Sequence, residues 1–502
     1  MSPIAAAAHA RSRRRRRLRF VAALALAPLC ARAAPPADQW FTVLLDGRKI
    51  GSFESARAVE DRRVVTTQTL DLVLDRAGSR VALSSSETST ETVDGKPLAF
   101  RSVSRLSGSE TAIDGRLHDG TVDVSVRTGD EVRRRRMRWP RGALLPEGLR
   151  LAALRAGLAP GTRYRELAFQ PSSLDAAEMT GVVHAAEDVD LPGGRRRLSP
   201  VEQTIAFAGA PMKSRAWVDA DQTIYKLTTP ILGVELTLLA CDRACATAPN
   251  QGSDVFERTL MPSPRPLSPH ELAGTVRYTL AARGDDAAPP LPQTGEQTVR
   301  RDRGGWTVTV GRDARARAED APGADDVRAN DWLQSNAPEI VRLARRAAGG
   351  ATGAGERMQR IERFVRGYIR DKSLDVGYAS ALEVARHPEG DCTEHAVLVA
   401  ALGRALGIPT RVVDGLAYAP GFAGRDRVFV PHAWAQAWVD ARWQSFDAAL
   451  DGFDAGHIAL SVGNGDPWRF YAGLDLLGRL ELRAVETVRD APDADAAPAG
   501  GG

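Results

Sequence analysis

The sequence is poor in cysteine and lacks an apolar run long enough to cross a membrane. Four cysteines in 502 residues are too few for a scaffold built on disulfides. The apolar run at residues 20–29 is about half of the roughly 20 residues that a transmembrane helix needs. We therefore expect no transmembrane segment in the mature chain. A hydrophobic content of 43% with 26% charged residues excludes a fibrous or wholly disordered protein.

Residues 1–33 resemble an export signal. The basic stretch RSRRRRRLRF precedes the apolar run FVAALALAPL, and the small residues Ala31 and Ala33 flank Arg32 as at a cleavage site. This pattern predicts a periplasmic or secreted protein.

Removal of this signal changes the charge balance. It takes away eight arginines and no acids, so the formal charge moves from +4 to 4 − 8 = −4. The sequence pI of about 9.0 thus belongs largely to the signal, and we expect no nucleic-acid partner. The remaining basic run, EVRRRRMRW at 131–139, is typical of a solvated edge strand, with a polyanion site as the alternative.

The N-terminal half is predicted to be β-rich. Asp-Gly pairs at 46–47, 94–95, 114–115 and 119–120 are hairpin signals between alternating, β-branched runs. Many short strands with such turns indicate an antiparallel sandwich or open barrel. We predict the following organisation: signal peptide 1–33, β-rich domain 38–258, Pro-rich linker and small β module 259–325, α+β catalytic domain 326–485, and disordered tail 486–502.

From about residue 330 the apolar period becomes helical. In SNAPEIVRLARRA, Asn336 is a candidate N-cap with Glu339 three residues on, and ERMQRIERFVRGYIRD repeats the helical period. Strand-like segments follow the helices, which is an α+β order.

The cysteines suggest one reactive thiol. Cys241 and Cys245 are close enough to bridge a turn in an oxidising compartment, which leaves Cys392 as a reactive thiol or an intermolecular partner. In GDCTEHAVLVAALGRALGIP, Asp391 fits an N-cap with Glu394 closing a capping box. Cys392 is then the first residue of a buried helix, where the helix dipole favours the thiolate. A base is still required.

His432 is the candidate base, and Asp447 is its candidate partner. If the chain turns at 440–441 so that Val439 opposes Arg442, His432 and Asp447 become diagonal neighbours on one face of a hairpin. A thiol, an imidazole and a carboxylate in this order form a nucleophile, a base and an orienting group.

A zinc site is the competing interpretation. His387, Cys392 and His395 are close in sequence, but their spacing is not that of a standard zinc site and a fourth ligand is missing. We expect neither metal nor cofactor, and we interpret His395 as a structural histidine with hydrogen bonds.

The segments GDCTEHAVLVAALGRALGIPTRVVDGLAY and HAWAQAWVDARWQSFDAA resemble the catalytic core of the bacterial transglutaminase-like superfamily, papain-like in architecture. This resemblance covers roughly residues 335–455. It implies that Cys392 is the nucleophile, His432 the general base and acid, and Asp447 the orienting carboxylate. One departure is that no Trp lies between Met358 and Asp391, where animal transglutaminases have one near the oxyanion.

The expected function is therefore cysteine-dependent acyl transfer on a protein or peptide substrate, through a thioester. The acceptor would be water in a protease or amidase and an amine in a transglutaminase. The alternative is a catalytically inactive binding or assembly module of the cell envelope with the same fold.

Overall fold

The computed structural model describes residues 38–488, except 77–78, 107–108, 130, 208–209, 232–233, 253–258, 284–289, 303, 312–313, 315–319, 373–378 and 466–478. The predicted signal at 1–33 lies outside the described residues, as does the predicted tail beyond 488. Within the described residues, no helix combines the length and the apolar character needed to cross a bilayer.

The N-terminal half is β-rich, as predicted, and its strands belong to one 16-stranded sheet. The order runs from β8 to β1, continues with β16 to β13, and ends with β11, β10 and β9, while β12 pairs with β13. Because β8 and β9 end this path without pairing with each other, the sheet is not closed. The strands are β1 (Gln39–Leu45), β2 (Arg48–Glu60), β3 (Arg63–Arg76), β4 (Ser79–Thr92), β5 (Pro97–Leu106), β6 (Ser109–His118), β7 (Thr121–Thr128), β8 (Glu131–Arg138), β9 (Ala143–Leu144), β10 (Arg163–Gln170), β11 (Asp175–Val183), β12 (Glu187–Val189), β13 (Arg196–Phe207), β14 (Ala210–Val218), β15 (Ile224–Ile231) and β16 (Val234–Cys241).

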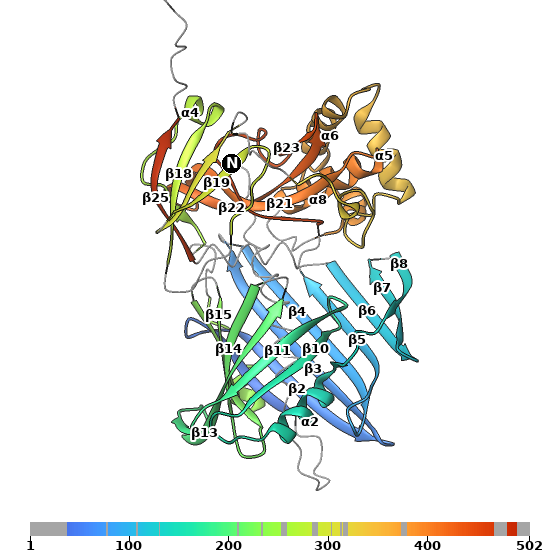
Figure 1. Cartoon of the computed structure of the whole chain (residues 1–502), viewed down its shortest axis with the longest axis vertical. Coiled ribbons are helices and arrows are strands. Elements are labelled where there is room, and N and C mark those ends of the chain that lie inside the picture. Colours follow the sequence, from blue (N-terminus) through green and yellow to red (C-terminus); the bar gives the residue numbers. More distant parts are fainter. Residues whose placement is uncertain are drawn as a thin grey trace, which may run out of the picture.

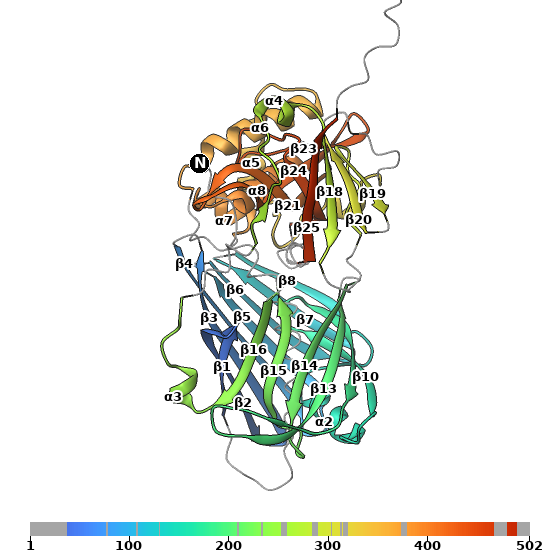
Figure 2. The ribbon, with the colours of Figure 1, turned by 90° about the vertical axis from the view of Figure 1, so that its left-hand side faces the viewer.

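The sheet bends over so that its two halves share one core. In Figures 1 and 2 the green strands β13 and β14 lie across from the blue strands β2 and β3. Leu45 and Leu72 from one half belong to the same buried cluster as Met179 and Ile205 from the other. Helix α2 (Pro146–Ala156) adds Leu149 to this cluster.

Most of the predicted Asp-Gly turns are present, but one is not. The pairs 46–47 and 119–120 have positive φ at both residues and connect adjacent strands. Asp114 and Gly115 instead lie inside β6, so that turn prediction is wrong. The glycine is needed there because a Cβ atom would lie 2.1 Å from the ring of Phe100 on the neighbouring strand.

The C-terminal half has the predicted α+β order and contains two smaller sheets. Its long helices are α5 (Pro338–Ala348), α6 (Ala354–Tyr368), α7 (Ala381–Arg386) and α8 (Cys392–Ala405). One sheet has β17 (Met261–Pro262), β22 (Arg425–Val439), β21 (Thr410–Phe422) and β24 (His457–Gly463) in that order, with β23 (Arg442–Phe446) paired to β22. The other has β19 (Gln297–Asp302), β20 (Gly305–Val310), β18 (Val276–Ala282) and β25 (Leu480–Thr487). The short helices are α3 (Arg243–Ala246), α4 (Pro269–Ala273) and the 3-10 turn η1 (Ala324–Asp326).

Helix α8 is the centre of the C-terminal core. It packs against β21, β22 and the other three long helices, and its side chains are buried along almost its whole length. Tyr278 of β18 and Leu482 of β25 belong to the same buried cluster as Val397 of α8. The small β module thus shares its core with the helices and the second sheet.

Two local predictions have different outcomes. Cys241 and Cys245 are joined in a disulfide, as predicted. The predicted cap at Asn336 is wrong, because α5 begins at Pro338 and its N-cap is Ala337, which makes no side-chain cap hydrogen bond. A proline at the first helical position keeps the preceding residue extended and so determines where the helix starts.

The basic run at 131–139 forms β8, which is an edge strand as predicted. Two of its arginines contact Asn330 and Asp331, in the loop that precedes α5. Arg133 Nη1 donates to the carbonyl oxygen of Asn330 at 2.6 Å, and Arg135 pairs with Asp331 at 3.6 Å. This contact links the large sheet to the C-terminal half.

Candidate active site

Cys392 lies at the first position of α8 and is fully buried. Asp391 caps the helix by accepting a hydrogen bond from the amide of Thr393 at 2.9 Å. The amide of Asp391 in turn donates to Glu394 at 3.0 Å, which completes the predicted capping box. The sulfur therefore lies at the positive end of the helix dipole, which favours a thiolate, whereas burial and the carboxylates of Asp391 and Glu394 oppose it.

Glu394 connects this helix start to the preceding chain. One carboxylate oxygen accepts from the amide of Ala379 at 2.8 Å, and the other accepts from the hydroxyl of Thr393 at 2.9 Å. Gly390 has a φ of +144° and lies against this carboxylate side chain. Asp391 and Glu394 therefore fix the position of the first turn of α8, and they do not form a separate acidic site around the thiol.

The hairpin that carries His432 has the predicted register. Val439 pairs with Arg442, and Asp440 and Ala441 have φ of 51° and 59°, as a two-residue hairpin turn requires. This register brings the side chain of His432 on β22 to that of Asp447, directly after β23. The Nε2 atom of His432 lies 2.7 Å from Oδ2 of Asp447, and both side chains are buried.

Asp447 is held on all sides as a carboxylate. Its Oδ1 atom accepts from the amides of Ala449 and Leu450 at 2.8 and 3.1 Å. Burial raises the pKa of Asp447, but the charge and hydrogen bonds of His432 and His457 outweigh this and hold that pKa well below its usual range. The ionised carboxylate fixes the orientation of the His432 ring.

A second imidazole, that of His457, binds the same carboxylate oxygen, a contact that the sequence did not predict. Its Nε2 atom lies 3.0 Å from Oδ2 of Asp447, and its Nδ1 atom lies 2.9 Å from Oδ1 of Asp454. Burial lowers the pKa of His457, but the hydrogen bonds to Asp447 and Asp454 outweigh burial and raise the pKa to about 10. His457 is therefore an imidazolium at neutral pH. The sequence signal for this contact was Asp454, three residues before His457 at the start of a strand, and this pattern is too common to predict a site.

The remaining nitrogen of His432 is the one that can act as a base. Because Nε2 is engaged by Asp447, proton transfer to or from this ring must use Nδ1. That atom is buried and makes no hydrogen bond to any described residue. Catalytic hydrogen bonds are often long before substrate binds, so an open Nδ1 is compatible with a base.

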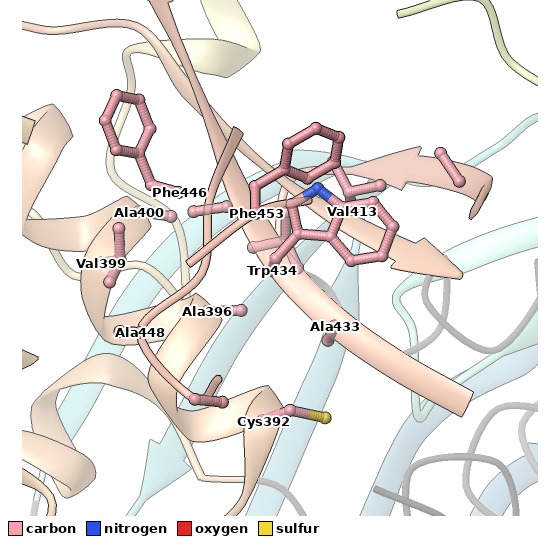
Figure 3. Packing of buried hydrophobic residues seen from close by; sticks show 14 of the residues in the cluster. Cys392, Ala396, Val399, Ala400, Val413, Ala433, Trp434, Phe446, Ala448 and Phe453 are labelled. Carbon is pink, nitrogen blue, oxygen red and sulfur yellow. The ribbon is translucent and has the colours of Figure 1, made fainter. Parts of the chain in front are cut away.

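Figure 3 shows how the thiol lies relative to the strand that carries His432. The Cys392 sulfur points from the first turn of α8 toward β22, where Ala433 and Trp434 lie. Cys392, Ala433 and Trp434 belong to one buried cluster. His432 is the residue before Ala433, so Cys392 and His432 are on elements that pack against each other.

Aromatic rings enclose the two imidazoles. The ring centroids of Trp434 lie 6.1 Å from His432 and 5.3 Å from His457, and Phe453 lies 5.0 Å from His457. Gly415 on β21 makes room for this packing, because a Cβ there would lie 2.9 Å from the Trp434 ring. These rings keep water from the charged groups.

One ring nitrogen of His395 makes a hydrogen bond, as the structural interpretation expects, while Nε2 is buried without a hydrogen-bond partner among the described residues. Its Nδ1 atom lies 2.6 Å from the carbonyl oxygen of Asp391, one turn earlier in α8. Burial lowers the pKa of His395 even though this hydrogen bond favours the charged form. His395 is therefore neutral at physiological pH.

The metal interpretation receives little support from the donor geometry. His387, Cys392 and His395 do not form a ligand group within the described residues, where the converging donors are His432, Asp447 and His457. These three atoms lie within 4.8 Å of one another. They are joined to one another at hydrogen-bond distances, through Oδ2 of Asp447.

Two tyrosines shortly precede Cys392 in the sequence and carry a hydroxyl that could bind an oxyanion, Tyr368 and Tyr378. Tyr368 donates its hydroxyl to the carbonyl oxygen of Ala385 at 2.5 Å. Tyr378 lies outside the described residues. The backbone amide of Cys392 is a further candidate donor.

Comparison with known proteins gives one family match. Residues 341–448 match the family model of the transglutaminase-like superfamily. No curated protein matches the chain. A β-barrel-like protein of a domain of unknown function from Brucella abortus is 15% identical, covering 41% of this chain and 96% of that chain, with a TM-score of 0.33. A proposed cysteine protease from Cytophaga hutchinsonii is 15% identical, covering 43% of this chain and 86% of that chain, with a TM-score of 0.28. Both scores are below 0.5, so neither structure supports a conclusion here.

Proposed function

Because residues 341–448 belong to the transglutaminase-like superfamily, we propose that the protein is an exported cysteine-dependent acyl-transfer enzyme. The observation that carries this proposal is the 2.7 Å contact between His432 Nε2 and Asp447 Oδ2, which leaves the opposite ring nitrogen open. Cys392 is the nucleophile, His432 the general base and acid, and Asp447 the orienting carboxylate.

The reaction follows from these roles. His432 Nδ1 takes the thiol proton of Cys392 as the sulfur forms a bond to the carbonyl carbon of an amide or peptide. The tetrahedral intermediate collapses to a thioester when the carbon–nitrogen bond breaks, and His432 returns the proton to the departing amine. His432 then removes a proton from the acceptor, whose attack releases the thiol. Asp447 holds the ring and stabilises its positive charge throughout.

The acceptor decides between hydrolase and transferase. Water gives a protease or amidase, and a primary amine gives a transglutaminase. We favour hydrolysis because water is far more abundant than any amine acceptor. A peptide panel incubated with and without an added primary amine separates the two: amine-dependent mass gain identifies a transferase, and cleavage or ammonia release alone identifies a hydrolase.

Alkylation of the thiol tests the catalytic assignment directly. The mature protein is incubated with iodoacetamide from pH 5 to 9, and the labelled cysteine is located by peptide mapping. We expect Cys392 to react well below pH 8.5, the ordinary range of a thiol, and to lose this reactivity in His432→Ala. An ordinary titration near pH 8.5 that is the same in both proteins would falsify the proposal.

One observation favours a second candidate, an inactive binding or assembly module of the cell envelope. Cys392 and His432 are buried, with exposed fractions of 0% and 2%, so a substrate reaches them only after local opening. The two candidates differ in turnover. A single stoichiometric labelling of Cys392 with no release of product from any peptide would favour the module.

The proposal includes the cellular location of the protein. The basic and apolar pattern of residues 1–33 supports export to the periplasm or beyond. Cell fractionation with N-terminal sequencing tests it, and a mature chain that begins near residue 34 is the expected result.

A further inference from the structure

The buried His457 and its partly exposed partner Asp454 lie beside the proposed catalytic triad and have no role in the mechanism above. His457 is on β24, two strands away from β22, with β21 between them. Its exposed side-chain fraction is 2%. A fully buried histidine is costly unless both ring nitrogens have partners, and here both face carboxylates.

The two imidazoles compete for one oxygen atom. His432 Nε2 and His457 Nε2 lie 2.7 and 3.0 Å from the same Oδ2 of Asp447, and their ring centroids are 5.6 Å apart. Asp454 Oδ1, at 2.9 Å from Nδ1, completes the salt bridge on the far side of His457. Asp454 thus favours the charged ring, and that ring donates to Asp447.

We propose that His457 is a positioning residue that lowers the pH at which His432 gives up its proton, with Asp454 keeping His457 charged. This inference rests on the proposed function of the triad. A positive charge at His457 offsets the carboxylate that would otherwise stabilise protonated His432. The His432 imidazolium is then the stronger acid toward a departing amine, and neutral His432 is available as a base at lower pH.

The other charged and titratable groups around this network do not substitute for His457. Arg366 Nη2 and Lys372 Nζ donate to backbone carbonyls of Asp447 and Ala449 at 3.1 and 3.0 Å, and Glu362 accepts from the amide of Asp447 at 2.7 Å. On the Asp454 side, the hydroxyl of Tyr278 donates to the carbonyl oxygen of Ala455 at 2.6 Å. His395 on α8 also interacts electrostatically with Asp447, and the buried carboxyl of Asp414 lies on β21, between the strands of the two histidines.

The test uses the full mature protein and the variant His457→Gln, whose amide keeps a hydrogen-bond donor for Asp447 but carries no charge. We expect the pH at which Cys392 alkylation rises, and the acidic limb of kcat/KM where a substrate is in hand, to move upward by about 1 to 2 pH units. His184→Gln, at a half-exposed histidine of the N-terminal sheet beside Glu202, is the matched control and leaves the profile unchanged.

Two further measurements test the same inference if the enzyme has no known substrate or if His457→Gln does not fold. The first is an NMR titration of the His432 ring in a Cys392→Ser background, with and without His457→Gln. The pH at which the ring loses its proton should rise in His457→Gln, and this measurement needs no catalytic activity. Asp454→Asn, at a side chain 39% exposed, removes the support for the charged ring and is expected to shift the profile in the same direction if His457→Gln does not fold.

The results separate this inference from the proposed function. A His432 titration that is the same with and without the charge at His457 overturns the inference, even if Cys392 proves catalytic. A shifted His432 titration in a protein whose Cys392 has no elevated reactivity supports the inference and overturns the proposed function.

Discussion

A Cβ atom at Gly390 would lie 2.3 Å from Cγ of Glu394, closer than any real pair of such carbons. The two residues flank the cap of α8, and Glu394 accepts hydrogen bonds from both Asp391 and Ala379. The position of Cys392 thus depends on a glycine with a φ of +144° and on a buried carboxylate.

Gly390→Ala is expected to destabilise the C-terminal half by about 2–4 kcal/mol, because it combines backbone strain with overpacking against Glu394. Chemical denaturation measures this change. Gly367→Ala is the matched control, since a Cβ there meets nothing within 4 Å inside α6, and it should be neutral or stabilising by up to about 1 kcal/mol. Equal effects of the two substitutions would contradict the role of Gly390.

Asp447→Asn is expected to lower the rate of Cys392 alkylation at neutral pH and to reduce kcat/KM on the order of 10³-fold. The amide keeps the shape of the side chain, but its NH₂ group cannot accept from His432 Nε2, so the ring loses its required tautomer. Asp451→Asn is the control, because Asp451 is fully exposed and pairs only loosely with Arg366 at 3.8 Å. Undiminished reactivity in Asp447→Asn would argue against the proposed role of Asp447.

The stability of the protein should fall between about pH 6.5 and pH 10 through His457. The pKa of His457 is raised from 6.5 to about 10 in the folded protein. A raised histidine pKa contributes stability that is complete below the unfolded value and is lost as pH rises through the folded value. The full contribution is on the order of 5 kcal/mol. Unfolding free energies at pH 6, 8 and 10 should therefore decline more steeply in the wild type than in His457→Gln, and parallel declines would refute this linkage.

The disulfide predicts a specific labelling pattern. In the denatured but unreduced mature protein, Cys392 alone should react with iodoacetamide, and Cys241 and Cys245 should join it after reduction. The double substitution of Cys241 and Cys245 by serine should cost about 2 kcal/mol, because the closed loop is short. Labelling of all three without reductant would show that the bridge does not form.

Local features of the site were predictable from sequence because they depend on short-range rules. The capping box at Asp391 and the two-residue turn after Val439 follow from residue types at fixed offsets, and the turn fixes which residues oppose each other. His432 and Asp447 meet for that reason. Asp114-Gly115 resembles a turn equally well, but the neighbouring Phe100 ring needs the glycine within a strand, which is a tertiary effect that no local pattern contains.

His457 was missed for a related reason. It reaches Asp447 only because β21 lies between β22 and β24, and this strand order is not written in the spacing of the residues. For the N-terminal half, the sequence predicted an antiparallel sandwich or open barrel but not the order of the 16 strands. That order depends on pairs such as β1 with β16, which are almost 200 residues apart in the sequence.

The arginines of β8 have a consequence for how copies of this protein meet. A long sheet that is not closed offers its outermost strand as a template on which a second copy could build. Here that strand carries Arg134, Arg135 and Arg136, all exposed, on alternating faces of the strand. Charged side chains on an edge strand disfavour its pairing with the same strand of a second copy. The opposite end of the sheet is only the two-residue strand β9, which is too short to act as such a template.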